Sequence, residues 1–206
     1  MTINLEKIYA GLKAWRHERG ITAESQKEGY LVNIMEELGE LATALREYER
    51  FSKPSYPYQK NKKYAEHGII DALCDISVFT INAGADIPCA KKDLETHTGQ
   101  LKASFAMLIE ACAIFAQDKE YSTVDYIADV KAFEYHIFFN DILHICACLA
   151  YDYGFDFQIA MDETIKEISS RTGAYDENAK KWVKDTSLEA KAKWYQANYE
   201  LARIEK

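Results

Sequence analysis

The chain has 206 residues, of which 48% are hydrophobic and 28% are charged, so it can bury the core of one large or two small globular domains. Its 33 acidic residues outnumber 25 basic ones. The resulting net charge of −8 argues against a general nucleic-acid binder, which must neutralise phosphates. No run of 18 apolar residues and no signal-peptide layout occurs, and the five cysteines include no CxxC pair. We therefore expect a cytoplasmic protein with no membrane span and no zinc site.

Residue types that favour helices dominate the sequence. Only three prolines and nine glycines occur, and no proline follows Pro88. We therefore predict a single all-α domain over 1–206. Apolar periodicity and helix-ending residues predict helices over 3–18, 22–51, 63–86, 99–117, 123–153 and 156–170. A basic loop at 52–63 and a polar, amphipathic tail over 177–204 complete the chain.

Two of the predicted helices have related sequences, DALCDISVFTINAGADI (71–87) and DILHICACLAYDYGFDF (141–157). They align without a gap, which indicates a duplicated helical hairpin. The copies differ at an acidic position, since Ile145 stands where the first copy has Asp75. We expect an acidic half over 20–90, a degenerate half over 98–170, and a basic turn with a C-terminal helical tail over 171–206.

Three glutamates lie close together within the predicted helix 22–51. The sequence MEELGELATAL carries Glu36, Glu37 and Glu40 beside an apolar stripe. At about 100° per residue, Glu37 lies at the edge of this stripe, Glu40 comes next, and Glu36 lies farther round. We therefore expect Glu37 and Glu40 to face the bundle interior more than Glu36 does.

The predicted helix 63–86 is apolar almost all round, yet it carries Asp71 and Asp75 on one face. Two unpaired carboxylates on a buried helix repel each other and lose hydration, so they require a compensating positive charge. A lysine or arginine is one candidate, although the neighbouring helical sequence offers few. A divalent cation is the other, and Glu37, Glu40, Asp71 and Asp75 would supply the oxygen ligands that Mg²⁺ prefers. Mn²⁺ is an alternative metal.

The EExxE pattern of residues 36–40, followed by the acidic segment DALCD (71–75), resembles the all-α nucleoside triphosphate pyrophosphohydrolases. This family includes MazG proteins, dCTP pyrophosphatases and dimeric dUTPases. The resemblance covers residues 25–87, and the segment 166–185 is similar to the basic stretch that follows the bundle in phage MazG-like proteins. It implies a four-helix-bundle core, Mg²⁺ on acidic helices, hydrolysis of a nucleoside triphosphate to monophosphate and pyrophosphate, control of nucleotide pools, and a homodimer.

The second acidic motif departs from the family pattern. The usual motif is ExxD, but Ala72 stands where its glutamate would be, so that Asp71, one residue earlier, must replace it. Some phage-type members carry a similar Asp-x-x-x-Asp helix. Simple MazG proteins assemble the bundle from two chains, whereas a silent second half resembles the dimeric dUTPases, in which one chain supplies the whole bundle.

The implied reaction assigns roles to further residues. Glu36, with Glu37, is the candidate for orienting and deprotonating the attacking water. Family members often place a base-stacking aromatic where Phe79 stands, and Asn82 is a candidate for contacting a base edge. The phosphate-binding candidates are Arg171, Lys181 and Lys184, with Lys60, Lys62 and Lys63 as second choices. Trp15 and Arg16 are candidates for closing over a base. Each of these side chains also has an ordinary structural interpretation, as a core or surface residue.

Two other classes of protein stay open at this point. A ferritin-like di-iron bundle requires two Glu-x-x-His motifs, and only Asp141-x-x-His144 comes near. A non-catalytic helical interaction protein would show no metal-dependent change in stability. The preferred base and sugar are not determined by the sequence.

Overall fold

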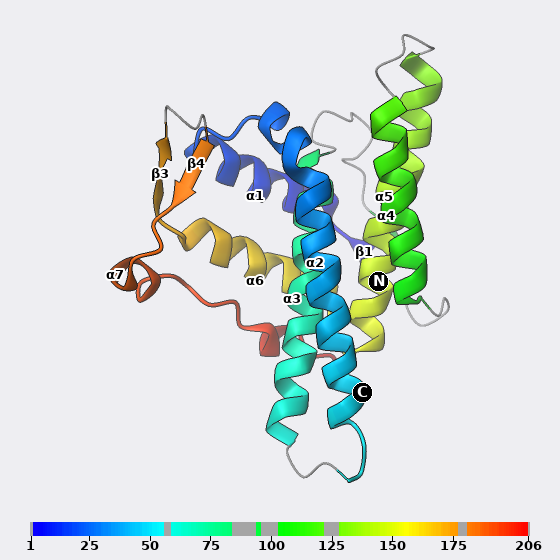
Figure 1. Cartoon of the computed structure of the whole chain (residues 1–206), viewed down its shortest axis with the longest axis vertical. Coiled ribbons are helices and arrows are strands. Elements are labelled where there is room, and N and C mark those ends of the chain that lie inside the picture. Colours follow the sequence, from blue (N-terminus) through cyan, green and yellow to red (C-terminus); the bar gives the residue numbers. More distant parts are fainter. Residues whose placement is uncertain are drawn as a thin grey trace.

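The computed structural model describes the backbone of residues 2–55, 59–83, 94–95, 103–121, 128–176 and 181–205. Within these ranges the chain is mostly helical, as predicted (Figure 1). The α-helices are α1 (Leu5–Glu18), α2 (Ala23–Phe51), α3 (Gln59–Ala83), α4 (Phe105–Tyr121), α5 (Ala128–Asp152), α6 (Phe157–Ser170) and α7 (Leu188–Lys191). None of these helices is both long and apolar enough to cross a membrane.

The long helices form two antiparallel pairs that meet at α3. Helix α2 packs along α3, α4 packs along α5, and α3 also contacts α5 (Figure 1). Helices α1 and α6 pack on each other and on α3, so α3 has neighbours on several sides. Two short antiparallel sheets complete the structure: β1 (Thr2–Ile3) with β2 (Leu94–Glu95), and β3 (Gly173–Asp176) with β4 (Lys181–Lys184).

Helix α3 is buried on nearly every face, as its apolar sequence predicts. Two of its buried polar residues are satisfied within the helix: the hydroxyls of Ser77 and Thr80 each donate a 2.8 Å hydrogen bond to the carbonyl four residues earlier. The positions that are only partly buried include Asp71, Asp75 and Phe79, which follow one another at one-turn spacing. The single open stripe of α3 is therefore acidic at two of its positions.

Arg19 joins α1 to the end of α6 and to β4. Its Nη2 donates hydrogen bonds to the backbone carbonyls of Ser169 (2.8 Å), in the last turn of α6, and of Arg171 (3.0 Å), directly after it. Its guanidinium also lies over the rings of Trp15 (5.6 Å) and Trp182 (5.2 Å). A cation at a helix C-terminus binds carbonyls that have no partner within the helix. This contact fixes where the chain leaves α6.

The predicted C-terminal helical tail is wrong in its secondary structure. The chain after α6 forms the β3–β4 hairpin, then only the one-turn α7 and the 3₁₀ helix η2 (Tyr199–Ala202). A Cβ atom at Gly173 would collide with the Val183 carbonyl and the Trp182 ring, so β3 pairs with β4 closely at this glycine. These tertiary contacts, rather than a helical period, determine the conformation.

Helix bounds follow the predictions closely for α1, α2 and α6, and differ elsewhere. The helix predicted over 99–117 is α4, which begins at Phe105 and ends at Tyr121. The helix predicted over 63–86 begins earlier, at Gln59, so the basic loop predicted over 52–63 is shorter. Residues 84–93, at its predicted end, lie outside the described residues. Of the five cysteines, four are free and buried, as their apolar surroundings predict, and Cys89 is outside the described residues.

Replacing Arg19 by alanine should destabilise the protein, because carbonyls at the end of α6 lose their donor. Hydrogen bonds involving a charged group contribute about 1.5–3 kcal/mol, and we expect the free energy of unfolding in urea to fall by that amount. Arg19→Lys should restore little, since an ammonium cannot stack between two rings. The exposed Arg46 of α2 is the control. A loss for Arg19→Ala no larger than for Arg46→Ala would contradict this role.

Candidate functional site

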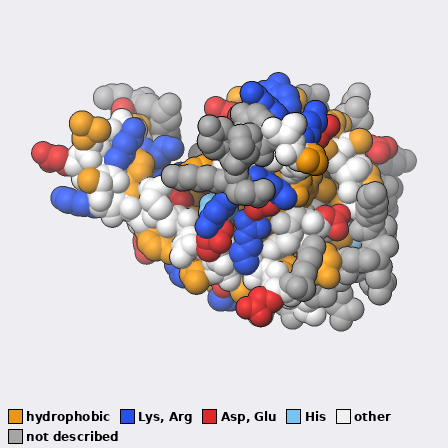
Figure 2. All heavy atoms as spheres, turned by 90° about the horizontal axis from the view of Figure 1, so that it is seen from below, with side chains coloured by type: hydrophobic (Ala, Val, Ile, Leu, Met, Phe, Trp, Pro, Cys, Tyr) orange, Lys and Arg blue, Asp and Glu red, His pale blue; other side chains and the backbone are white. Residues whose placement is uncertain are grey.

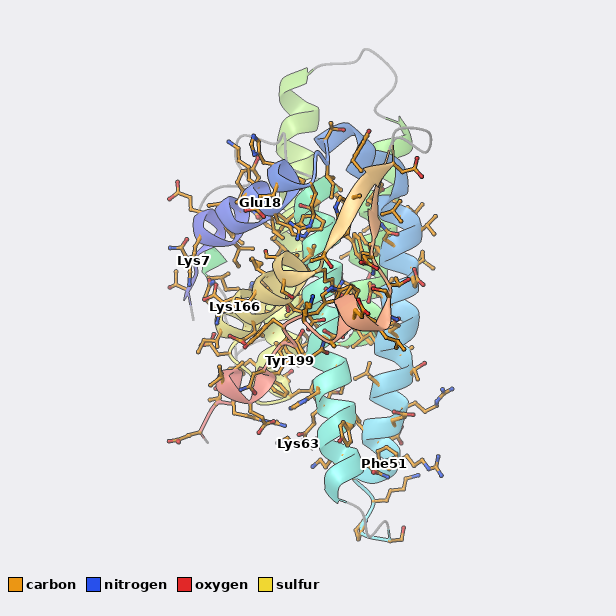
Figure 3. All side chains as sticks on the ribbon, turned by 90° about the vertical axis from the view of Figure 1, so that its left-hand side faces the viewer. Lys7, Glu18, Phe51, Lys63, Lys166 and Tyr199 are labelled. Atoms are coloured by element: carbon orange, nitrogen blue, oxygen red, sulfur yellow. The ribbon has the colours of Figure 1, made fainter. Side chains whose placement is uncertain are left out.

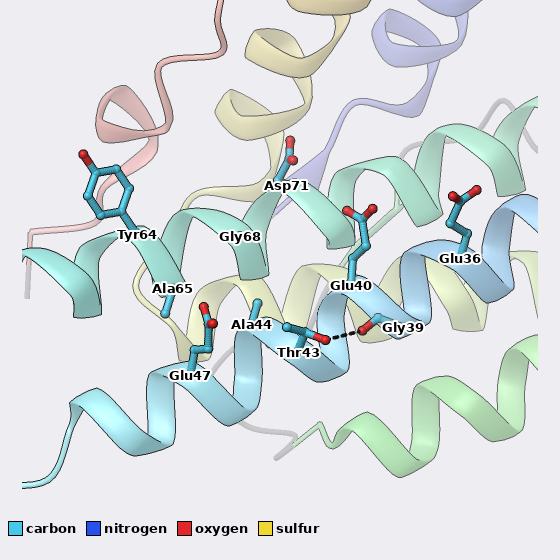
Figure 4. Close-up of a pocket in the computed structure, with 10 residues that line it drawn as sticks. All are labelled: Glu36, Gly39, Glu40, Thr43, Ala44, Glu47, Tyr64, Ala65, Gly68 and Asp71. Atoms are coloured by element: carbon cyan, nitrogen blue, oxygen red, sulfur yellow. Dashed lines mark hydrogen bonds between the residues drawn. The ribbon is translucent and has the colours of Figure 1, made fainter.

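An open pocket of about 420 Å³ lies along the contact between α2 and α3 (Figure 4). The carboxylates of Glu36 and Glu40 on α2 and of Asp71 on α3 point to the same side of the helix pair (Figure 4). The helices approach closely here, since a Cβ at Gly68 would lie 3.3 Å from the Cβ of Ala44. The other lining residues are Gly39, Thr43, Ala44, Glu47, Tyr64, Ala65 and Gly68.

The five predicted acidic residues differ in exposure. Glu37, Asp71 and Asp75 are partly buried, as predicted. Glu40 is exposed like Glu36, although we expected it to face the interior, because both side chains line the open pocket. The site therefore has an inner group of three carboxylates and an outer group of two glutamates.

The inner carboxylates lie close enough to repel one another. Burial raises the pKa of Glu37 to about 7, with further contributions from the charges of Glu40, Asp71 and Glu36. Burial also raises the pKa of Asp75 well above its ordinary value, and the charges of Asp71 and Glu37 add to the rise. The pKa of Asp71 is raised by burial despite a hydrogen bond from Tyr199. The structure thus brings Glu37 and Glu40 of α2 together with Asp71 and Asp75 of α3.

Arg171 is the positive charge that acts on this cluster. Its charge lowers the pKa values of Glu37, Asp71 and Asp75 against the larger effect of burial. It stands directly after α6, and its Nη2 donates a 2.8 Å hydrogen bond to Oε1 of Glu167. Its Nε is buried without a hydrogen-bond partner among the described residues. One predicted phosphate-binding residue is therefore placed beside the predicted metal ligands.

The inner carboxylates have no direct ion pair. Within the described ranges, no Lys, Arg or His nitrogen lies within 4 Å of a carboxylate oxygen of Glu37, Glu40, Asp71 or Asp75. Arg171, whose charge acts on these carboxylates, forms its ion pair with Glu167 instead. An ordinary lysine or arginine counter-ion thus does not account for the buried negative charge.

Two residues of the site were not predicted. The charge of Glu167 raises the pKa values of Asp71 and Asp75, so it belongs to the same cluster. Tyr199 is buried and donates a 2.6 Å hydrogen bond to Oδ1 of Asp71. Glu167 lies one turn before Arg171, and this spacing is a signal for an ion pair. Tyr199 lies in the polar tail 128 residues from Asp71, and nothing in the local sequence indicates that the two residues meet.

The two base-binding candidates lie farther along α3 and do not line the acidic pocket. Phe79 is partly buried and packs against the core, which is its structural interpretation. Asn82 is buried, and its Oδ1 accepts a hydrogen bond from Nη1 of Arg16. Trp15 donates a 3.1 Å hydrogen bond to the Ile168 carbonyl. Arg16 and Trp15 are therefore engaged in contacts within the protein.

The lysine candidates are not gathered at the acidic pocket. Lys63 forms a 3.1 Å ion pair with Glu200, and Lys62 lies 3.9 Å from Glu66. Figure 2 views that end of the molecule and shows basic and acidic side chains intermixed among the described residues. Lys184 is exposed on β4. Lys60 and Lys181 are among the residues whose side chains the structure does not describe.

The second half of the chain carries a smaller and less acidic pocket. It has a volume of about 290 Å³ between α4 and α5 and is lined by Glu110, Asp141 and His144 together with apolar residues. Ile145 also lines it, at the position that aligns with Asp75. Burial raises the pKa of Asp141, whereas the charge of His144 lowers it. Two carboxylates line this pocket, whereas four line the α2–α3 pocket: Glu36, Glu40, Glu47 and Asp71.

Among the described residues, the carboxylates at the α2–α3 contact do not form a closed metal cage. In the described part of the chain, no three Asp, Glu, His or Cys side chains converge closely enough to hold one metal ion. Mg²⁺ is usually bound through one or two carboxylates, several waters and substrate phosphates, rather than by an all-protein cage. The available ligands are carboxylate oxygens, which suit Mg²⁺ or Mn²⁺. Asp141-x-x-His144 lies on α5, in the other pocket, which does not favour a di-iron centre at the α2–α3 site.

Comparison of the chain with protein-family models, curated proteins and solved structures finds no match. The acidic pocket and its surroundings are therefore the basis for assigning a function.

The raised pKa of Glu37 should make the stability of the metal-free protein depend on pH. Glu37 ionises near pH 4.5 in the unfolded chain but near pH 7 in the folded chain. Between these values the folded state binds more protons, so this group's contribution to the free energy of unfolding falls as pH rises from about 4.5 to 7. Over this window, the free energy of unfolding of Glu37→Gln should rise relative to that of wild type by on the order of 1–3 kcal/mol.

Urea unfolding with EDTA at several pH values measures that difference. Glu49→Gln, on the exposed side of α2, is the control and should follow the wild-type profile. A Glu37→Gln variant that becomes less stable than wild type as pH rises would show that Glu37 is stabilised as a charged partner.

Proposed function

We propose that this chain hydrolyses a nucleoside or deoxynucleoside triphosphate to the monophosphate and pyrophosphate, in the presence of Mg²⁺ or Mn²⁺. The observation that carries the proposal is the acidic cluster at the α2–α3 contact, where the partly buried Glu37, Asp71 and Asp75 lie together and Asp71 lines the pocket. The pKa values of these carboxylates are raised although the charge of Arg171 lowers them, and none has an ion pair among the described residues. The resemblance of the EExxE and DALCD segments to the all-α pyrophosphohydrolases supports this reaction type and a homodimer.

A metal site explains the cluster better than a structural role does. Carboxylates retained for stability are normally paired, because an unpaired buried charge loses hydration without compensation. The charge of Asp71 instead raises the pKa values of Glu37 and Asp75, and the charge of Glu37 adds to the rise at Asp75. A divalent cation would reverse this repulsion and favour the charged form of every member. The repulsion in the metal-free protein is thus the expected cost of a cation-binding site.

The residues have distinct roles in this proposal. Glu37, Glu40, Asp71 and Asp75 would bind Mg²⁺, one or two of them directly and the others through water, and the ion would neutralise the triphosphate and polarise the attacked phosphorus. Glu36, exposed at the pocket, would orient the attacking water and accept its proton, together with Glu37. The pocket volume of about 420 Å³ lies within the range of small-molecule sites.

Arg171 would bind the outer phosphates. Its guanidinium presents several N–H groups, of which one is used by Glu167 and the buried Nε has no partner among the described residues. It stands close enough to the carboxylates to lower their pKa values, so a phosphate bound to Arg171 would lie beside the cation site.

The products test the reaction class. Incubation with a panel of ribonucleoside and deoxyribonucleoside triphosphates, including dUTP, and Mg²⁺ should yield a monophosphate and intact pyrophosphate. Phosphorus NMR distinguishes these products directly. Release of a diphosphate and orthophosphate would place the attack at another phosphorus and contradict the proposal. A panel with no turnover and no Mg²⁺-dependent shift in melting temperature would favour a non-catalytic interaction protein.

Replacing Asp75 by asparagine tests the metal site, because it removes a charge and keeps the shape. We expect Mg²⁺-dependent hydrolysis to fall about 100-fold or more, while the metal-free protein is equally or more stable in urea. Glu40→Gln should behave alike, and Glu36→Gln should slow turnover with a smaller effect on metal affinity.

Asp141→Asn is the control, because Asp141 is the aspartate of α5 that aligns with Asp71. It should leave turnover nearly unchanged, since Ile145 removes its acidic neighbour. If Asp75 were a structural ion-pair partner, its loss would cost about 3–5 kcal/mol with activity retained, and that result would overturn the metal site.

A further inference from the structure

A tyrosine from the C-terminal end of the chain contacts the acidic site. Tyr199 lies on η2, is only 4% exposed, and donates a 2.6 Å hydrogen bond to Oδ1 of Asp71 (Figure 3). Among the described residues, this is the only hydrogen bond from a side chain to Glu37, Glu40, Asp71 or Asp75. One oxygen of Asp71 is therefore occupied, while the residue still lines the pocket.

The phenol is held between α3 and α6. Its oxygen lies 3.0 Å from Oγ1 of Thr164, which itself contacts the Ala160 carbonyl at 3.1 Å. With the Tyr199 proton donated to Asp71, the single Thr164 proton is donated either to the Ala160 carbonyl or to the phenol oxygen. Burial raises the pKa of Tyr199 well above its ordinary value, so the phenol keeps its proton and stays a donor.

The segment that carries Tyr199 is fastened independently of Asp71. The backbone N–H groups of Ala197 and Asn198 donate hydrogen bonds to the carboxylates of Glu167 (2.8 Å) and Glu163 (3.0 Å) on α6. Beyond Tyr199, the Ala202 carbonyl accepts a 2.6 Å hydrogen bond from the N–H of Asp156. The chain is thus anchored on both sides of the tyrosine by hydrogen bonds that do not involve Asp71.

We propose that Tyr199 is a positioning residue of the cation site. Its hydroxyl holds Oδ1 of Asp71 and so fixes the orientation of the carboxylate, which leaves the other oxygen for a divalent cation in the pocket. Hydrogen-bonding partners that orient metal ligands in this way typically raise metal affinity roughly 10- to 100-fold. The role in hydrolysis rests on the proposed function, whereas the role in cation binding is measurable without nucleotide.

Tyr195→Phe supplies a matched control for Tyr199→Phe. Tyr195 lies on the same segment, and its hydroxyl also donates a hydrogen bond to a carboxylate, that of Glu163, which is paired with Lys166. Both variants remove one phenol hydroxyl. Tyr195→Phe removes its hydrogen bond to Glu163 of α6, and Tyr199→Phe removes the hydrogen bond to Asp71 of α3 and the contact with Thr164 of α6. Only Tyr199→Phe changes a residue assigned to the cation site.

The experiment measures Mn²⁺ binding to the full chain without nucleotide, from the electron paramagnetic resonance signal of free Mn²⁺. We expect Tyr199→Phe to weaken Mn²⁺ binding about 10-fold or more, and Tyr195→Phe to leave the affinity within about 2-fold of wild type. In hydrolysis assays, the Mg²⁺ concentration for half-maximal rate should rise for Tyr199→Phe more than the rate at saturating Mg²⁺ falls. Urea unfolding in EDTA verifies that each variant is folded.

A double-mutant cycle shows whether Tyr199 acts through Asp71. In an Asp71→Asn background, Tyr199→Phe should cause little further loss of Mn²⁺ affinity. Equal Mn²⁺ affinities for the two tyrosine variants would overturn the inference and leave the proposed hydrolysis intact. Mn²⁺ binding that depends on Tyr199 in a chain that hydrolyses no triphosphate would uphold the inference and reject the proposed function. A wild-type chain that binds no Mn²⁺ would overturn both.

Discussion

Repulsion among carboxylates at the α2–α3 contact is the interaction on which the rest of the site depends. Asp71 and Asp75 lie one turn apart on the open stripe of a helix that is otherwise buried, and Glu37 approaches them from α2. Charges in such a place are screened by water much less than charges on the surface. Arg171 offsets only part of the repulsion, since the pKa values of all three carboxylates stay raised. The site therefore favours a ligand that brings more positive charge.

The layer formed by α6 and the segments after it supplies what α2 and α3 lack. Arg19 binds the carbonyls at the end of α6 and so fixes the position of the Arg171 backbone. The C-terminal segment then returns along α6 and places Tyr199 against Asp71. Arg171, the proposed phosphate-binding cation, and Tyr199, the donor to Asp71, thus come from the same layer. Its contacts with α1 and α3 keep that layer in a defined position relative to the acidic helices.

The helices and the acidic cluster could be predicted because both depend on local sequence. A period of 3.6 residues places Asp71 and Asp75 on one face, whatever lies beyond the helix. The same period places Asn82 near that face, two turns after Asp75. It does not show that Arg16 of α1 donates a hydrogen bond to the Asn82 side chain. The β3–β4 hairpin and Tyr199 could not be predicted, since their positions depend on contacts with α6 and α1 rather than on periodicity.

The second helical pair shows that this architecture does not require the acidic residues. At the position that aligns with Asp75, α5 carries Ile145, which is 7% exposed and belongs to the core. An apolar residue at this position packs without the cost of burying a charge. The stability of a helical pair thus gives no reason to retain Asp75, whose pKa is raised by burial and by its acidic neighbours. A residue that the fold does not need, and that is costly where it stands, is best explained by what it binds.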